Sequence, residues 1–135
     1  MGENLTVRGA TELDVCIGDI WRWGSALLQV SAPRGPCYKL GIRLGRQALR
    51  TVVREEGLVG WYLRVLVHGR VPTTGAITRK EQHGDRVTVA EVQAAINDSA
   101  NTYDELATLD PLSPVVRRAL TIRNRDLLGG VPEAD

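Results

Sequence analysis

The first third of the chain groups its apolar residues in the short, closely spaced runs that are typical of β-strands. Residues 15–17 and 20–23 read Val-Cys-Ile and Ile-Trp-Arg-Trp, with glycine and aspartate between them, which predicts an extended run with a bulge at the glycine. A tight turn at Gly24-Ser25 leads into the apolar residues 26–30, so the region predicts a β-hairpin. We expect Trp21 and Trp23 to belong to a half-buried strand rather than to stack on a cofactor.

Two further extended segments are predicted between residues 61 and 80. Residues 61–67 read Trp-Tyr-Leu-Arg-Val-Leu-Val and are bounded by glycines, which predicts a buried strand at the core of the sheet. Residues 71–80 contain Pro72 and Gly75 and predict another extended segment. Between the hairpin and these strands, residues 45–57 have helical periodicity and end at a glycine.

After residue 85 the apolar spacing becomes helical. Each expected helix begins at a recognisable cap: Thr88 with Glu91, Thr102 with Glu105, and Ser113 followed by Pro114. The expected helices cover residues 89–97, 102–108 and 114–128. The pattern therefore predicts a mostly β fold with α-helices, in which residues 1–85 form a sheet domain, residues 86–128 a small three-helix domain and residues 129–135 a tail.

Composition and the apolar runs favour a cytoplasmic globular protein. The chain has 135 residues and 43% hydrophobic residues, and no run approaches the ~18–20 apolar residues that span a bilayer. No charged and then apolar leader opens the sequence. Residues 1–6 match the N-myristoylation pattern, but no polybasic segment follows to supply a second anchor, so we expect no membrane attachment.

Charge is unevenly divided along the chain. The formal net charge is +1, with 12 basic against 8 acidic residues in 1–85 and 5 against 8 in 86–135. The basic first part suits an anionic small ligand. The last helix carries four arginines (Arg117, Arg118, Arg123 and Arg125), which invites a helix-turn-helix interpretation. The acidic balance of the whole segment argues against binding to a nucleic acid duplex.

The strongest candidate for chemistry is Cys37, which follows two prolines in a stiff loop. Arg34 and Lys39 flank it, and neighbouring cations favour the thiolate, which is both a nucleophile and a metal ligand. The alternative is a buried structural cysteine, because free cysteines are often buried. The other cysteine, Cys16, is not spaced for a zinc site with Cys37, and we expect both thiols to be reduced.

Four stretches together resemble the MOSC domain, which is named for the C-terminal domain of molybdenum-cofactor sulfurases. They read Gly-Glu-Asn-Leu-Thr at residues 2–6, Cys-Ile-Gly-Asp at 16–19, Pro-Arg-Gly-Pro-Cys-Tyr-Lys-Leu at 33–40 and Gly-Trp-Tyr-Leu-Arg-Val at 60–65. The sequence is most similar to the bacterial YiiM-like branch, and residues 87 to about 128 resemble the 3-alpha domain that follows MOSC there. The resemblance implies a partial MOSC β-barrel, since family members usually carry about half a barrel before the Gly-Glu-Asn-Leu turn, including a His-Gly-Gly segment.

The resemblance also implies a cofactor and a set of site residues. The family binds the molybdenum cofactor, in which molybdopterin carries a dithiolene and a phosphate, and Cys37 would be the catalytic residue and the protein ligand to molybdenum. Arg34 and Lys39 would contact the phosphate, and Asn4 would line the pocket. Relatives reduce N-hydroxylated compounds such as hydroxylaminopurine bases, which requires a small-molecule substrate and a redox partner for electrons.

Two other functions stay open. The chain could be a non-catalytic subunit that binds or delivers the cofactor, as a homodimer or with a complementing chain that supplies the rest of the barrel. Pyridoxal phosphate chemistry, as in sulfurase proteins, is less favoured because Lys39 has no evident partner for a pyridine nitrogen. Whether the chain is an enzyme is therefore undecided by the sequence.

Overall fold

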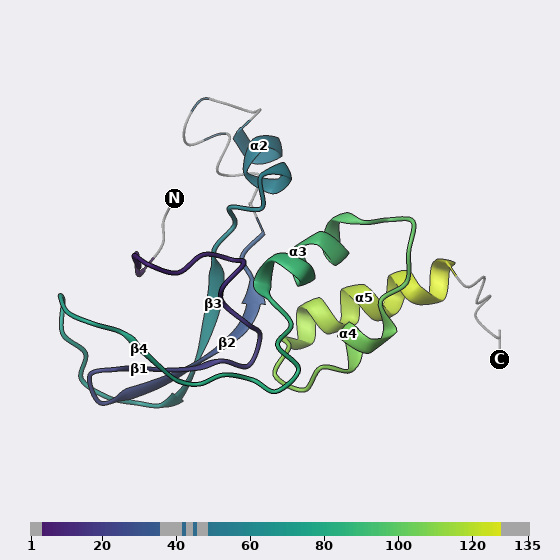
Figure 1. Ribbon diagram of the computed structural model, residues 1–135. Helices are drawn as coiled ribbons and strands as arrows, with labels where there is room; N and C mark the ends of the chain where they lie inside the picture. Colours follow the sequence, from purple (N-terminus) through teal and green to yellow (C-terminus); the bar gives the residue numbers. More distant parts are fainter. Residues whose placement is uncertain (1–3, 36–41, 43–44, 46–48, 128–135) are drawn as a thin grey trace.

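The computed structural model describes residues 4–35, 42, 45 and 49–127, and it contains one four-stranded antiparallel sheet (Figure 1). In sheet order the strands are β3 (Trp61–Val67), β2 (Ala26–Pro33), β1 (Ile20–Trp23) and β4 (Thr78–Glu81). The described helices are α2 (Leu49–Glu55), α3 (Val89–Asn97), α4 (Asp104–Thr108) and α5 (Pro114–Leu127). The prediction of a mixed fold, with strands followed by helices, is confirmed.

The predicted hairpin is confirmed. Trp23 pairs with Ala26 across the turn, and the pairing of β1 with β2 continues to Ile20 opposite Gln29. Residues 15–17, which we expected to be a strand, make only an isolated bridge between Cys16 and Thr88. The fourth strand is shorter than the extended segment predicted over residues 71–80, because only Thr78–Glu81 pairs with β1.

The expectation that residues 61–67 form a buried central strand is wrong. The residues do form β3, but it lies at an edge of the sheet, and β2 is the only described strand that pairs with it. Tyr62, Val65, Leu66 and Val67 are between 42% and 55% exposed. A continuous apolar run identifies a strand, whereas the position of that strand in a sheet depends on which other strands pair with it.

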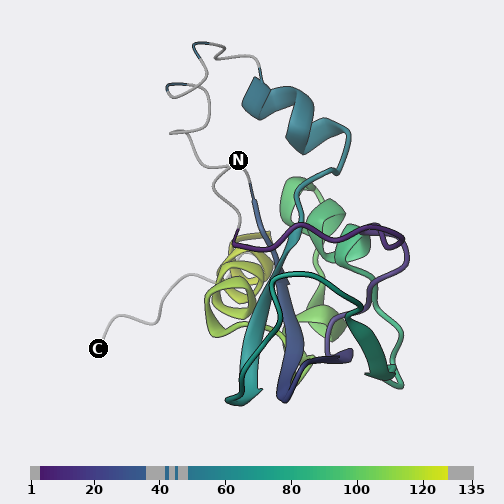
Figure 2. The same ribbon diagram turned by 90° about the vertical axis from the view of Figure 1, so that its left-hand side faces the viewer.

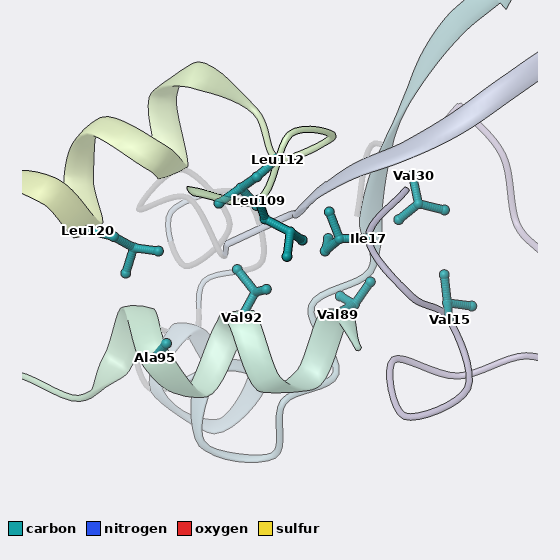
Figure 3. Close-up of a cluster of buried hydrophobic side chains, with 9 residues drawn as sticks. All are labelled: Val15, Ile17, Val30, Val89, Val92, Ala95, Leu109, Leu112 and Leu120. Atoms are coloured by element: carbon teal, nitrogen blue, oxygen red, sulfur yellow. The ribbon is translucent and has the colours of Figure 1, made fainter. Parts of the chain in front are cut away.

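Helices α3, α4 and α5 gather on one side of the sheet, while α2 stands apart near the start of β3, as both views show (Figures 1 and 2). The core lies between the sheet and these helices and is entirely aliphatic (Figure 3). Its members come from the segment before β1, from β2, from α3, from the loop after α4 and from α5: Val15, Ile17, Val30, Val89, Val92, Ala95, Leu109, Leu112 and Leu120. The helices are thus packed on the sheet through one continuous apolar layer.

The turn before β1 ties the sheet to the start of α3. The N–H of Ile17 donates to the carbonyl of Val87 at 2.8 Å, and the N–H of Val89 donates to the carbonyl of Val15 at 2.8 Å. Gly18 has φ +91° in this turn, and a Cβ there would lie 2.5 Å from the ring of His83. The turn therefore needs glycine for its conformation and for the close approach of the segment that follows β4.

Two of the three predicted helix caps agree with the structure. Thr88 and Glu91 form a full capping box at α3, and the Ser113 hydroxyl accepts from the N–H of Val116 at 3.4 Å. The expected box of Thr102 and Glu105 is wrong, because α4 begins at Asp104 and its N-cap residue, Tyr103, makes no side-chain capping bond to the helix. Instead the buried Asn124 of α5 accepts from the N–H of Tyr103 at 3.0 Å and donates to the Asp104 carboxylate at 2.7 Å.

Two arginines of α5 donate hydrogen bonds to backbone carbonyls in the helical part of the chain. The Arg123 guanidinium donates to the carbonyls of Ala95, Ile96 and Asp98 at the end of α3. The Arg117 guanidinium donates to the carbonyls of Leu109 and Asp110 at 2.9 and 2.8 Å. Cationic side chains that meet the last carbonyls of a helix stabilise its C-terminal end. Among the described helices, none is both long and apolar enough to cross a membrane.

Candidate cofactor-binding pocket

An open pocket of about 650 Å³ lies between the N-terminal segment and the first half of β3. The N-terminal segment contributes four polar residues, Asn4, Thr6, Thr11 and Glu12, together with the apolar Leu5, Val7 and Ala10. The part of the lining that comes from the sheet and the residues before β3 is largely apolar and includes Trp21, Leu58, Trp61, Tyr62 and Leu63. The volume lies within the ~300–1,000 Å³ that is common for small-molecule sites, and mixed walls of this kind are typical of them.

Gly60 joins the chain segments that line the pocket through its backbone hydrogen bonds. Its N–H donates to the Glu12 carboxylate at 2.7 Å, and its carbonyl accepts from the N–H of Arg34 at 2.9 Å. The backbone carbonyl of Glu12 accepts in turn from the N–H of Ala90 in the first turn of α3, at 3.0 Å. The N-terminal segment, the end of β2, the start of β3 and α3 therefore meet at this pocket.

The structure brings Asn4 and Arg34 to the same pocket. Asn4 is exposed and Arg34 is half-buried, and both line it. Arg34 is a cation at the end of the pocket where β2 gives way to the cysteine loop, a place where an anionic group of a ligand would be stabilised. Cys37 and Lys39, the other two predicted site residues, lie outside the described residues, so their roles stay predictions.

Four pocket residues, Glu12, Trp21, Trp61 and Tyr62, were not singled out from the sequence as site residues. Trp21 was expected to be an ordinary strand residue, yet it lines the pocket, and its buried Nε1–H has no hydrogen-bond partner among the described residues. Trp61 and Tyr62 belong to a motif stretch but were considered only as strand residues. No local signal marks Glu12, because its side-chain partner lies 48 residues away along the chain.

The described part of the chain holds no cluster of three or more His, Cys, Asp or Glu residues suited to a metal ion. Cys16 is a buried free cysteine whose Sγ lies 3.9 Å from the Nε2 of Gln82, and it does not line the pocket. Cys16 is thus a buried thiol outside the pocket lining.

A family model and individual relatives both match this chain. The MOSC domain model matches residues 1–89. Protein YiiM of Escherichia coli is 42% identical over 93 residues, which are 69% of this chain and 41% of YiiM. A protein of Gibberella moniliformis named "Reductase" is 38% identical over 113 residues, which are 80% of this chain and 20% of that protein.

Solved structures agree with the sequence comparison. Crystal structures of YiiM from Geobacillus stearothermophilus and Escherichia coli superpose with TM-scores of 0.79 and 0.77, at 31% and 35% identity. They match 86% and 93% of this chain, which spans 61% and 62% of the respective YiiM chains. Because a family model covers more than half of the sequence and the fold agrees at over 30% identity, the chain belongs to the MOSC domain family, in the branch that contains YiiM.

Proposed function

We propose that this chain binds the molybdenum cofactor in the pocket between its N-terminal segment and β3, and that it takes part in the reduction of N-hydroxylated compounds. The observation that carries the proposal is the meeting of Asn4 and Arg34 in one pocket, at the start of the loop that carries Cys37. Membership of the MOSC family supports the cofactor, and the name of the fungal relative supports a reduction.

The described residues fit the pterin part of this cofactor. The aromatic side chains of Trp21, Trp61 and Tyr62 offer surfaces for a planar ring, and the buried Nε1–H of Trp21 has no partner among the described residues. Arg34 offers several N–H donors for a phosphate, and Asn4 offers both a donor and an acceptor. Buried polar atoms without partners are uncommon in folded proteins, so the orphaned Trp21 N–H is consistent with a ligand at this place.

Each residue then has a physical role. Cys37 would hold the metal through its thiolate, because a soft sulfur ligand suits a metal already bound by sulfur. Arg34 and Lys39 would hold the phosphate, and Asn4 would orient the ring. When bound, the cofactor supplies the two-electron chemistry that converts an N-hydroxyl group to an amine and water, with two protons taken up and both electrons delivered by a separate redox protein.

Metal analysis tests the proposal. The protein, purified from cells that make the cofactor, should contain molybdenum near one atom per chain together with a fluorescent oxidised pterin. Cys37→Ser should lose the molybdenum, since a hydroxyl is a poor ligand for a soft metal. Cys16→Ser is the matched control, because that thiol is buried away from the pocket and the Gln82 amide can still donate to a hydroxyl. Equal loss from both variants, or from neither, would contradict the assignment of Cys37.

The second candidate is a non-catalytic subunit that binds or delivers the cofactor. The chain spans 41% of Escherichia coli YiiM in the sequence comparison and 62% of it in the structural comparison, so the activity of the whole protein is a proposal for this chain. Cofactor-loaded protein that fails to reduce a hydroxylaminopurine with a chemical electron donor would favour this candidate. Folded protein that holds no cofactor would count against both.

A further inference from the structure

We propose that Glu12 binds the hydrogen-bond donor edge of a planar aminoheterocycle, namely the 2-amino and N3–H groups of a pterin, while aromatic side chains that line the same pocket pack against the ring. This inference rests on the proposed function, because it assigns a specificity residue to the same pocket. It concerns the ring alone and requires neither the metal nor the Cys37 thiol.

The Glu12 carboxylate is only partly engaged within the protein. One oxygen, Oε1, accepts from the N–H of Gly60 at 2.7 Å, and no other partner of the side chain is found among the described residues. An ionised carboxylate can accept about four hydrogen bonds. Glu12 is half-buried and lines the pocket, so its remaining acceptor sites are available to a ligand there.

The position of Glu12 is held from two directions. Its side chain is fixed by Gly60 at the start of β3, and its backbone carbonyl accepts from the N–H of Ala90 in α3 at 3.0 Å. A carboxylate held in this way has already lost much of its conformational freedom before a ligand arrives, which favours binding. Among the described residues that line the pocket, Glu12 is the only one with an anionic side chain.

Aromatic residues of the pocket supply the surface for the ring. Trp21 and Trp61 are half-buried and pack against the core on one side while they line the pocket on the other. Tyr62 also lines the pocket and is 55% exposed, which is unusual for a large aromatic residue without a partner. Aromatic side chains stack on planar heterocycles, and a carboxylate in the same pocket selects for rings that carry N–H donors on their edge.

The competing explanation is that Glu12 only joins the N-terminal segment to β3. Glu12→Gln separates the two explanations. The glutamine carbonyl oxygen can still accept from the N–H of Gly60, but an NH2 group replaces the second carboxylate oxygen and cannot accept the N–H donors of a ligand. A purely structural role would leave ligand preference unchanged in this variant. Direct binding of the ligand by Glu12 would make the ligand preference change in this variant.

The test compares pterin with lumazine, a matched ring that carries a carbonyl where pterin has the 2-amino group. Binding of each to the purified full chain is followed by tryptophan fluorescence, since two of the three tryptophans line the pocket, and by calorimetry. The wild-type chain should bind pterin about tenfold or more tightly than lumazine, because hydrogen bonds to a charged group are among the stronger ones. Glu12→Gln should abolish or invert the preference, and Glu105→Gln, which alters an exposed carboxylate on α4 outside the pocket, should retain it.

The outcomes separate this inference from the proposed function. Equal affinity for the two rings, a preference that survives Glu12→Gln, or no binding of either ring at millimolar concentration would overturn the role of Glu12. A preference for pterin that depends on Glu12, in a protein that never retains molybdenum, would uphold the inference and overturn the proposed reaction.

Discussion

At the scale of single residues, Asp98 is the clearest case of a carboxylate tuned by its neighbours. It lies just after α3 and accepts from the Tyr103 hydroxyl at 2.6 Å, from the Asn101 amide at 2.7 Å and from the N–H of Ala100 at 2.8 Å. These bonds, with Tyr103 the largest cause, lower the pKa of Asp98 from 3.8 to about 2. Hydrogen bonds to the charged form favour that form.

The shift predicts how stability depends on acidity. Because the pKa of Asp98 is lower in the folded chain than in the unfolded chain, its contribution is fully present above about pH 4 and is lost as the pH falls towards 2. Tyr103→Phe should raise the pKa of Asp98 towards 3.8 and move the acid-unfolding midpoint to higher pH. Carboxyl NMR titration and circular dichroism would measure the two effects.

Tyr62→Phe is the matched control for Tyr103→Phe. The Tyr62 hydroxyl makes no hydrogen bond within the described part of the chain, so its removal should leave the titration of Asp98 unchanged. A wild-type Asp98 that titrates near 3.8 would show that the three bonds are not maintained in solution.

At the scale of elements, Asp19 decides how the segment after β4 is joined to the sheet. The residue is fully buried, and its carboxylate accepts from the N–H of Cys16 at 3.1 Å and from the N–H of His83 at 3.0 Å. It also pairs with the Arg79 guanidinium at 3.4 Å. All four residues of β4 are exposed, so burial of its own side chains contributes little to holding it in place.

We therefore expect Asp19→Asn to loosen β4 and the start of the segment that leads to α3. The amide can accept from only one side and would present N–H groups to N–H groups, which should lower the free energy of unfolding by about 1–3 kcal/mol. Urea unfolding would measure the change, and hydrogen exchange at the amide of His83 should accelerate. Asp110→Asn, at an exposed site without a side-chain hydrogen bond among the described residues, should have neither effect.

At the scale of the whole molecule, the β3 edge of the sheet is an apolar surface that no described strand covers. The outer side of β3 presents backbone groups that no described strand pairs, and four of its seven residues are large apolar side chains at least 42% exposed. Its one charged residue, Arg64, donates to the Gln29 side chain at 3.2 Å and is drawn towards the neighbouring strand. Edge strands of this kind pair with other chains unless charge or cover prevents it.

The chain of 135 residues should accordingly self-associate as its concentration rises, with two β3 edges pairing antiparallel about a twofold axis. Leu66→Lys should weaken the association at least several-fold, because a lysine on an edge strand opposes pairing. Ile122→Lys on α5 is the control, since the two residues are similarly exposed at 42% and 47%. Sedimentation equilibrium would decide, and a chain that remains monomeric at hundreds of micromolar would contradict the prediction.

The sequence by itself determined the elements whose signals are local. The glycine turn between β1 and β2, the capping box of Thr88 and Glu91 and the helical periodicity of α5 each act within a few residues, and the structure agrees with all of them. The family was also readable from the sequence, because its motifs are short continuous stretches that resemble those of MOSC proteins, and the comparisons bear this out.

Tertiary structure alone decided the features that depend on distant partners. Asn124 holds the start of α4 through Asp104, 20 residues away, and through the N–H of Tyr103, so no capping pattern near Thr102 could predict it. The apolar run of β3 looked buried, but its exposure follows from the pairing order of the sheet. Glu12 and Trp21 became pocket residues only when the N-terminal segment came to lie beside β3, because a pocket is made by chain segments that meet in space and not by their order in sequence.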